Sequence, residues 1–319
     1  MNSDPTTVTL TLNPAFDVST AVARVEPAHK LRCDPPRFDP GGGGINVARV
    51  ILRLGGAALA VYPEGGSTGQ RLTGLLEAEG TPTRPSPIAG ETRESFTVMD
   101  QADGSEYRFV LPGPELSAAE LDACLDTAIA AASPQGFVVA SGSLPSGIGP
   151  DCFTELARRA RGAGLRLVVD TSGPPLAAAL EAGVYLAKPN LRELSDLVGR
   201  PLPDTASRVR ACRDLIAAGG SRVLALSLGA EGALLVTGDE AWSSPGLPVE
   251  PVSSVGAGDS FVGGFLWALN RELGLVEGFR HAMAAGTAAL LSPGTELCRR
   301  DDVFRLLDQV SATPVGSPA

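Results

Sequence analysis

One carboxylate of the chain directly follows a run of small residues. Asp259 ends the segment 255–259, VGAGD, and the apolar run behind it is typical of a helix. Small residues before a helix let several backbone N–H groups point at one place, where they can bind developing negative charge. A carboxylate beside such N–H groups can accept a proton from an alcohol during phosphoryl transfer. The segment therefore favours Asp259 as a general base.

Two other interpretations of Asp259 stay open. An aspartate at the start of a helix often serves only as its N-cap. The segment 258–262, GDSFV, also resembles a degraded hydrolase nucleophile turn, but Val262 stands where that motif has glycine. The chain contains only two histidines, His29 and His281, that could act as the base of a hydrolase. The hydrolase interpretation is the weaker one.

A second glycine cluster, residues 41–44, leads into Ile45, Asn46 and an apolar pattern with helical spacing over 45–54. Glycine lets a ligand approach the backbone closely, and the first turn of a helix offers free N–H groups to an oxygen-rich ligand. We favour ligand binding here over a flexible loop. The cluster lacks the Gly-Lys-Ser/Thr of a phosphate-binding loop and the GxGxxG of a dinucleotide site. A nicotinamide-dependent dehydrogenase is therefore not indicated.

Asn190 and Glu193 are three residues apart, so a helix starting there would carry both on one face. An amide and a carboxylate in that position could hold Mg²⁺ through its water ligands. Helix capping by Asn190 with Glu193 in the first turn explains the same spacing. The spacing alone favours capping.

Four further polar residues could contact an anionic or hydroxylated ligand. Asp17, after an Asn-Pro pair, could cap a turn or bind sugar hydroxyls. Lys30, Arg32 and Arg93 could be solvated surface charges, or they could bind an anionic group of a substrate.

Strand-like and helix-like segments alternate along most of the chain. This order predicts an α/β fold with a mostly parallel central sheet covered by helices on both faces. A capping box of Ser117 and Glu120 marks the start of one helix. The expected strands are 8–12, 57–62, 137–140, 166–170 and 223–227, and the expected helices are 45–54, 69–79, 116–132, 152–163, 206–218, 259–273, 275–291 and 302–310.

Two stretches, 18–38 and 91–111, contain strand-like pieces with no helix between them. A hairpin of 97–100 and 107–110 is expected in the second stretch. We expect the two stretches to form a small separate sheet. The main domain would then comprise 1–17, 39–90 and 112–310, with a frayed tail over 311–319.

The composition narrows the classes of function. The 319 residues carry a formal net charge of −10, which argues against binding to nucleic acid or to an anionic membrane. Five scattered cysteines without a CxxC pair suggest neither a disulfide framework nor a zinc site. No apolar run approaches the ~18 residues of a membrane span, and residues 1–5 lack the features of a secretory signal. We therefore expect a cytoplasmic protein.

Together these segments resemble the ribokinase-like (PfkB) family of carbohydrate kinases over nearly the whole chain. The two family signatures correspond to 43–48, GGINVA, and 253–259, SSVGAGD. The sugar-phosphate kinase branch is indicated by 9–17 (TLTLNPAFD), 141–145 (SGSLP), 188–190 (KPN) and 227–232 (SLGAEG). The segments 30–33 (KLRC), 41–44 (GGGG), 107–110 (YRFV) and 294–298 (GTELC) look most like the minor, PfkB-type 6-phosphofructokinases within that branch.

The resemblance implies a three-layer kinase domain with a small β-sheet lid, a homodimer formed through the lids, and transfer of the γ-phosphoryl group of MgATP to the C1 hydroxyl of fructose 6-phosphate. Asp259 would be the base, and the backbone of Gly256, Ala257 and Gly258 would form the anion hole. Asp17, Gly42, Gly43 and Asn46 would bind the sugar, while Lys30, Arg32 and Arg93 would face its phosphate. For ATP the resemblance implies Lys188, Asn190, Ser227, Gly229 and Gly258, and for Mg²⁺ it implies Asn190 and Glu193.

Some positions depart from the family pattern. Ser254 stands where many relatives have threonine. Ser292 and Glu296 differ from the family pattern in a loop that in relatives contributes to a monovalent-cation site, which leaves dependence on K⁺ open. Tagatose-6-phosphate kinase and 1-phosphofructokinase are alternatives within the family, because one or two hydrogen bonds distinguish such sugars. A non-catalytic sugar-phosphate sensor is the alternative from another class of protein.

Overall fold

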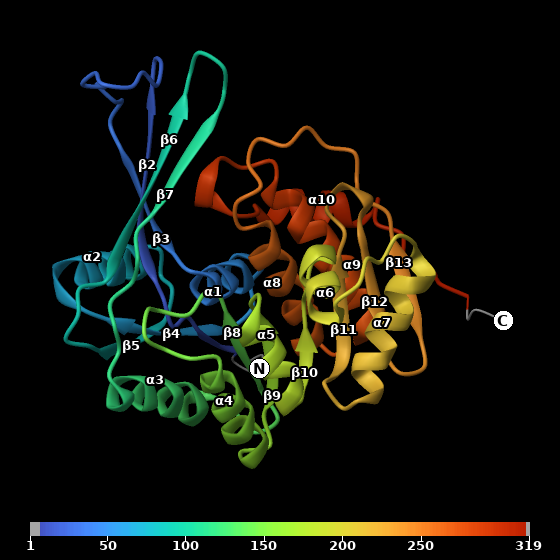
Figure 1. Ribbon diagram of the computed structural model, residues 1–319. Coiled ribbons are helices and arrows are strands. Elements are labelled where there is room, and N and C mark those ends of the chain that lie inside the picture. The colour runs from blue at the N-terminus through green and yellow to red at the C-terminus, as the bar shows by residue number, and fades with distance from the viewer. Residues whose placement is uncertain (1–6, 317–319) are drawn as a thin grey trace.

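A computed structural model describes residues 7–316 of the chain. Figure 1 shows an α/β body from which a small β-sheet rises on one side. The predicted fold class is confirmed. Residues 1–6 and 317–319, which include the expected leaderless start and the end of the expected tail, lie outside the described residues.

The large sheet has ten strands in the order β14-β13-β12-β11-β10-β9-β8-β1-β4-β5. The neighbours from β5 to β11 pair in parallel, whereas β12, β13 and β14 add an antiparallel edge. The strands are β1 Thr7–Leu10, β4 Ala58–Glu64, β5 Thr83–Pro87, β8 Phe137–Ser141, β9 Arg166–Asp170, β10 Val184–Ala187, β11 Ser221–Ser227, β12 Ala233–Val236, β13 Ala241–Ser244 and β14 Thr313–Pro314.

Helices cover both faces of this sheet, and its central strands β1 and β8 are accordingly buried at every position. In β8, Val139 packs into a core with α1, α2, α8, α9 and α10, while Val138 packs into a second core with α3 to α7. The helices are α1 Gly43–Arg53, α2 Gly66–Ala78, α3 Ala118–Ala131, α4 Asp151–Gly162, α5 Pro174–Ala182, α6 Leu191–Val198, α7 Thr205–Ala217, α8 Ala257–Asn270, α9 Gly274–Ala289 and α10 Arg300–Leu307.

The small sheet has the strand order β3-β2-β6-β7, with β2 Ala15–Val22, β3 Arg37–Gly41, β6 Arg93–Asp100 and β7 Glu106–Val110. The predicted hairpin is confirmed as β6 and β7. Strands β2 and β3 reach further toward the main body than the expected stretch 18–38, so Asp17 lies in the small sheet rather than in the main domain.

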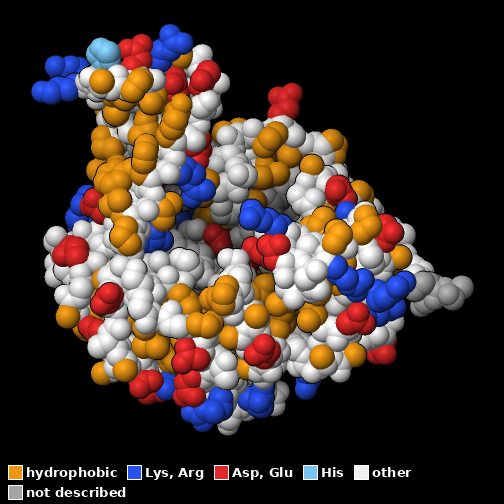
Figure 2. Space-filling model, viewed as in Figure 1, with side chains coloured by type: hydrophobic (Ala, Val, Ile, Leu, Met, Phe, Trp, Pro, Cys, Tyr) orange, Lys and Arg blue, Asp and Glu red, His pale blue; other side chains and the backbone are white. Residues whose placement is uncertain are grey.

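Each face of the small sheet has its own chemistry. Phe38, Val18, Phe96 and Phe109 pair side by side across the four strands and therefore share one face. Asp17 and its paired neighbours Asp39 and Ser95 share the other face. In Figure 2 the outward side of the rising sheet is rich in apolar side chains, and a hollow separates its inner side from the main body.

Most long elements were predicted within a few residues of their observed ends, including the Ser117–Glu120 capping box of α3. The expectation of a frayed tail was wrong for its described part, because Thr313–Pro314 pairs with β13. Short elements such as β5, β10, β12, β13 and α5 were not predicted. Within residues 7–316 the structure has no helix that is long and apolar enough to cross a membrane.

Candidate active site

A cavity of about 340 Å³ lies between the small sheet and the start of α8. The main body contributes Gly42, Asn46, Gly256 and Asp259 to its lining. From the small sheet come Asp17, Ser19, Arg93, Ser95, Thr97 and Arg108. The structure thus brings together residues from both glycine clusters, and four of the seven predicted substrate-binding residues line the cavity: Asp17, Gly42, Asn46 and Arg93.

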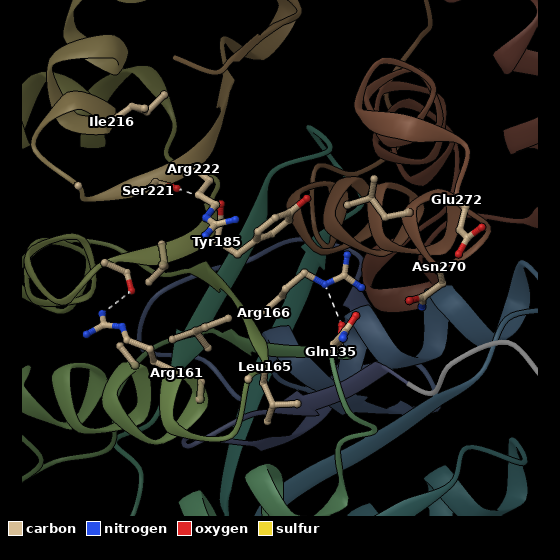
Figure 3. A pocket seen from close by; sticks show the side chains of 18 residues that line it. Gln135, Arg161, Leu165, Arg166, Tyr185, Ile216, Ser221, Arg222, Asn270 and Glu272 are labelled. Atoms are coloured by element: carbon tan, nitrogen blue, oxygen red, sulfur yellow. Dashed lines mark hydrogen bonds between the residues drawn. The ribbon is translucent and has the colours of Figure 1, made fainter. Parts of the chain in front are cut away.

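A larger cavity of about 980 Å³ lies at the amino ends of β9, β10 and β11 (Figure 3). Two of its arginines form hydrogen bonds with the backbone. Arg166 donates to the carbonyl oxygen of Gln135, and Arg161 donates to those of Ala182 and Gly183. Arg166 also stacks on the ring of Phe137 at 3.7 Å. None of the predicted site residues lines this cavity. We therefore assign the chemistry to the smaller cavity.

Asp259 lies in the first turn of α8, but it is not the N-cap. That position is taken by Gly256, whose φ of 73° is in the left-handed region that favours glycine. The N-cap interpretation of Asp259 is therefore wrong. Asn46 Nδ2 donates to Asp259 Oδ2 over 2.9 Å, and Ser141 Oγ donates to Asp259 Oδ1 over 3.4 Å. Two hydrogen bonds thus hold the carboxylate at the cavity.

Burial raises the pKa of Asp259 to about 6, and the nearby carboxylate of Asp170 adds to the rise. Asp170 itself forms an ion pair with Lys188, with Nζ 3.1 Å from Oδ1. Burial works against the charge on Lys188, but the attraction of Asp170 outweighs it and raises the pKa of the ammonium. The result is a carboxyl group with a pKa that suits proton transfer near neutral pH, beside a permanent cation.

The four-glycine stretch comes close to other backbone and side-chain atoms. Gly42 has a φ of 121°, which side chains rarely adopt. A side chain at Gly43 would collide with Ser141, and one at Gly44 would come within 2.6 Å of the carbonyl oxygen of Leu10. Packing therefore requires glycine at 43 and 44, and the backbone conformation favours it at 42. Asn46, in the helix that follows, reaches Asp259.

The other side of the cavity carries the cations. Arg93 donates to the carbonyl oxygen of Asn13 and to Ser95 Oγ, so its guanidinium is fixed at the start of β6. Burial raises the pKa of Asp17 to about 6, while Arg93 counteracts the rise. Arg108 on β7 also lines the cavity, and its side chain is 54% exposed.

Lys30 and Arg32 lie elsewhere. Both are exposed in the connection between β2 and β3, and neither lines the cavity. The geometry of this chain therefore does not join them with Arg93, and their contact with a phosphate stays a prediction.

The predicted nucleotide residues meet at the carboxyl ends of β10 and β11. Asn190 pairs with Ser227 as a parallel bridge, and the short helical turn that starts at Gly229 follows. Asn190 caps α6: its Oδ1 accepts from the backbone of Glu193, and Glu193 Oε2 accepts from the backbone of Asn190, both over 2.8 Å. Capping, which the spacing favoured, is therefore what the structure has.

Nothing in the described part of the chain forms a cluster of three or more His, Cys, Asp or Glu side chains that could hold a metal ion.

The hydrolase interpretation of Asp259 and its neighbours is wrong. Ser260 is fully buried, and neither His29 nor His281 lines the cavity.

Sequence reasoning missed Ser141, Asp170 and Arg108, and it also missed the smaller residues of the small sheet that line the cavity, Ser19, Ser95 and Thr97. Ser141 directly follows the predicted strand 137–140, and Asp170 ends the predicted strand 166–170. The carboxyl ends of parallel strands are where such folds bind ligands. That position could have singled them out. Arg108 stands between Tyr107 and Phe109 on a hairpin strand, where alternation predicts the opposite face.

Comparison with known proteins agrees with this geometry. Residues 11–302 match the pfkB family of carbohydrate kinases. The chain belongs to the PfkB family. Its relatives include the ATP-dependent 6-phosphofructokinase isozyme 2 of Mycobacterium tuberculosis, 46% identical over 95% of this chain and 89% of that one. A 1-phosphofructokinase of Haloferax volcanii is 35% identical over 97% of this chain and 98% of its own length.

Among solved structures, phosphofructokinase-2 of Escherichia coli shares the fold of this PfkB kinase. Its complex with fructose 6-phosphate superposes with a TM-score of 0.90 at 38% identity, covering 96% of this chain and 99% of that one. A complex with potassium gives a TM-score of 0.92 at 40% identity over the same shares, and a tetrameric inhibited form gives 0.90 at 39%. The chain is thus a phosphotransferase with an alcohol acceptor, and its family implies ATP and a metal ion.

Proposed function

We propose that this PfkB kinase transfers the γ-phosphoryl group of ATP to the C1 hydroxyl of fructose 6-phosphate, giving fructose 1,6-bisphosphate as in glycolysis. The observation that carries the proposal is the cavity with Asp259 at one side and Arg93 at the other. Phosphorylation of a sugar phosphate requires a base near the reacting hydroxyl and a cation near the phosphate already present, and the two sides of the cavity provide these groups.

In this reaction Asp259 accepts the C1 hydroxyl proton as the sugar oxygen bonds to the γ-phosphorus and the bond to the leaving ADP oxygen breaks. Asn46 and Ser141 orient the carboxylate through their hydrogen bonds. The first backbone N–H groups of α8, at Gly256, Ala257 and Gly258, would stabilise the charge on the phosphoryl group. Asp17, Gly42 and Gly43 would hold the sugar hydroxyls.

Lys188 is suited to the nucleotide phosphates. A methyl group added at Gly258 would lie 3.3 Å from Lys188 Nζ, so the ammonium lies directly beside the proposed anion hole. Asn190, Ser227 and Gly229 would line the rest of the nucleotide site. Magnesium, when bound, would reduce the negative charge of the phosphates. The capping box uses one oxygen of Glu193, so a contact with Mg²⁺ through water would use the other.

We also propose K⁺ as a cofactor near the loop after α9. The side chain of Ser292 is buried there, and its hydroxyl has no hydrogen-bond partner among the described residues. An orphaned buried oxygen is compatible with a cation ligand.

A homodimer through the small sheet is the proposed assembly. The outward face carries the apolar row defined above, and Phe38 and Phe109 remain 42% and 55% exposed. A second copy of the same sheet is a partner of matching chemistry.

We expect the protein to work in the cytoplasm, where ATP and phosphosugars are found.

The decisive experiment measures ADP release from MgATP with fructose 6-phosphate, tagatose 6-phosphate, fructose 1-phosphate and unphosphorylated fructose, each with and without K⁺. The highest kcat/KM with fructose 6-phosphate supports the proposal. A preference for fructose 1-phosphate or tagatose 6-phosphate would keep the mechanism and change the substrate. No turnover with any of them would favour the sugar-phosphate sensor.

A further inference from the structure

A single arginine joins the small sheet to the loop between α9 and α10. Arg37 begins β3, and its guanidinium makes contacts in three directions. Nε donates to Asp39 Oδ2 over 2.8 Å, within the same strand. Nη1 donates to Glu296 Oε1 over 2.9 Å, and Nη2 donates to the carbonyl oxygen of Pro293 over 3.2 Å. Two of the three contacts therefore reach a loop that lies more than 250 positions away in the sequence.

The same loop packs against the start of α8. Leu297 has a φ of 61° and a ψ of −172°, a conformation that a residue other than glycine keeps only where its surroundings hold it. Leu297 is fully buried, and a side chain at Gly256 would collide with Leu297 Cδ2. Because Gly256 is the N-cap of α8, the position of Leu297 bears directly on the direction of the first N–H groups of that helix.

Glu296 is the centre of this arrangement. Among the described residues three arginines contact it: Arg37 and Arg299 bind the carboxylate, and Arg53 donates to its carbonyl oxygen. Arg53 lies in α1, and Arg299 is adjacent to α10. Of these three arginines only Arg37 belongs to the small sheet, so its hydrogen bonds link the position of that sheet to the loop.

We propose that Arg37 is a positioning residue that couples the small sheet to the anion hole of the kinase. When β3 is in place, Arg37 fixes the loop through its hydrogen bonds to Pro293 and Glu296. The fixed loop keeps Leu297 packed against Gly256 at the start of α8. The inference rests on the proposed function, because it assigns to α8 the stabilisation of the transferred phosphoryl group. Arg37 does not line the cavity and so acts through other residues.

The ion pair of Arg37 with Glu296 contributes little to the free energy of unfolding, so its proposed role is to position the loop. Arg37 and Glu296 are each 36% exposed, and exposed pairs of this kind contribute about 0–1 kcal/mol. A displacement of catalytic groups by about 1 Å, in contrast, can lower a rate about a hundredfold. Loss of the contact with Glu296 should therefore change kcat far more than it changes the melting temperature, and any fall in the melting temperature of Arg37→Ala is expected from the buried carboxylate of Asp39, which loses its ion pair.

Arg37→Ala and Arg299→Ala each remove one arginine from the carboxylate of Glu296. Only Arg37→Ala also releases the small sheet and removes the arginine from the buried carboxylate of Asp39. We expect Arg37→Ala to lower kcat on the order of tenfold with little change in KM for ATP. The kcat of Arg299→Ala should stay within about twofold of that of the unchanged protein. Arg37→Lys, which keeps the charge and loses the fork, should fall between them.

Amide hydrogen exchange provides a readout that needs no turnover. In Arg37→Ala, but not in Arg299→Ala, exchange should become faster in 254–259 and 293–298. Unchanged exchange and kcat in Arg37→Ala, or equal losses in Arg299→Ala, would overturn the inference. If the unchanged protein turns over no phosphosugar, the proposed function fails, while the exchange data still decide whether Arg37 couples the two segments. Should Arg37→Ala not fold, Arg37→Lys carries the same comparison.

Discussion

The two sides of the active cavity are built in opposite ways. On the main body, Asp259 is held by Asn46 and Ser141, and the neighbouring Lys188 is buried in an ion pair with Asp170. On the small sheet, Val110 is 65% exposed and the side chain of Arg108 is 54% exposed. One side consists of buried groups with fixed partners, whereas the other is half-buried at Asp17 and Arg93 and open to solvent at its outer strand β7.

This difference separates chemistry from recognition. Charge that develops during phosphoryl transfer is best stabilised by groups that need no reorganisation, and such groups require buried partners. Binding of a phosphate on the substrate requires cations that are accessible before the substrate arrives. We therefore expect changes on the main-body side to lower kcat, and changes on the small-sheet side to raise KM for the sugar phosphate.

The largest expected effect is that of Asp259→Asn. The amide can still accept a hydrogen bond from Asn46, but it cannot accept the hydroxyl proton, so kcat should fall about 10²–10⁴-fold with a small change in KM. Because burial raises the pKa of this carboxyl to about 6, its ionised form is costly in the folded state, and the melting temperature at pH 7 should not fall. Retained kcat in steady-state assays would remove Asp259 as the base.

Arg93→Ala tests the other side. A charged hydrogen bond to a phosphate contributes about 1.5–3 kcal/mol, so KM for the sugar phosphate should rise about 10–100-fold while KM for ATP stays the same. Arg84→Ala, at an exposed position of β5, is the control and should change neither constant. Equal increases in both KM values would show that Arg93 supports the structure rather than the phosphate.

The sequence predicted single residues better than their contacts. Asp259 and Asn46 each follow a glycine cluster and were found separately, yet their hydrogen bond joins positions 213 residues apart. Asp170 was missed because one aspartate after a strand is ordinary until Lys188 is seen beside it. Lys30 and Arg32 were grouped with Arg93 because all three are cations in the stretches expected to form the small sheet and because the family resemblance implied one role for them. In the structure Arg93 begins β6 at the cavity, whereas Lys30 and Arg32 lie in the connection between β2 and β3. Local pattern therefore predicts elements, whereas packing decides which charges meet.

The pH dependence tests whether both sides of the cavity must be ionised. Burial raises the pKa of Asp17 and of Asp259 to about 6, so both are ionised above that pH and become protonated below it. The kcat/KM value should be constant above about pH 7 and should fall below pH 6, with a logarithmic slope approaching two. In Asp17→Asn that slope should decrease by one. Titration of the substrate phosphate affects both proteins equally, and equal slopes in the two profiles would contradict a shared role.

The smallest effect expected is that of Asn190→Ala, and it separates a structural role from a functional one. Loss of the N-cap of α6 should lower the free energy of unfolding by about 1 kcal/mol, measured by denaturant titration. Ser117→Ala removes the corresponding cap of α3 and should cost a similar amount. If Asn190 also serves the nucleotide site, only Asn190→Ala should raise KM for MgATP. If both variants lose stability alike and neither changes that KM, Asn190 is a cap alone, and the nucleotide site depends on Lys188, Ser227 and Gly229.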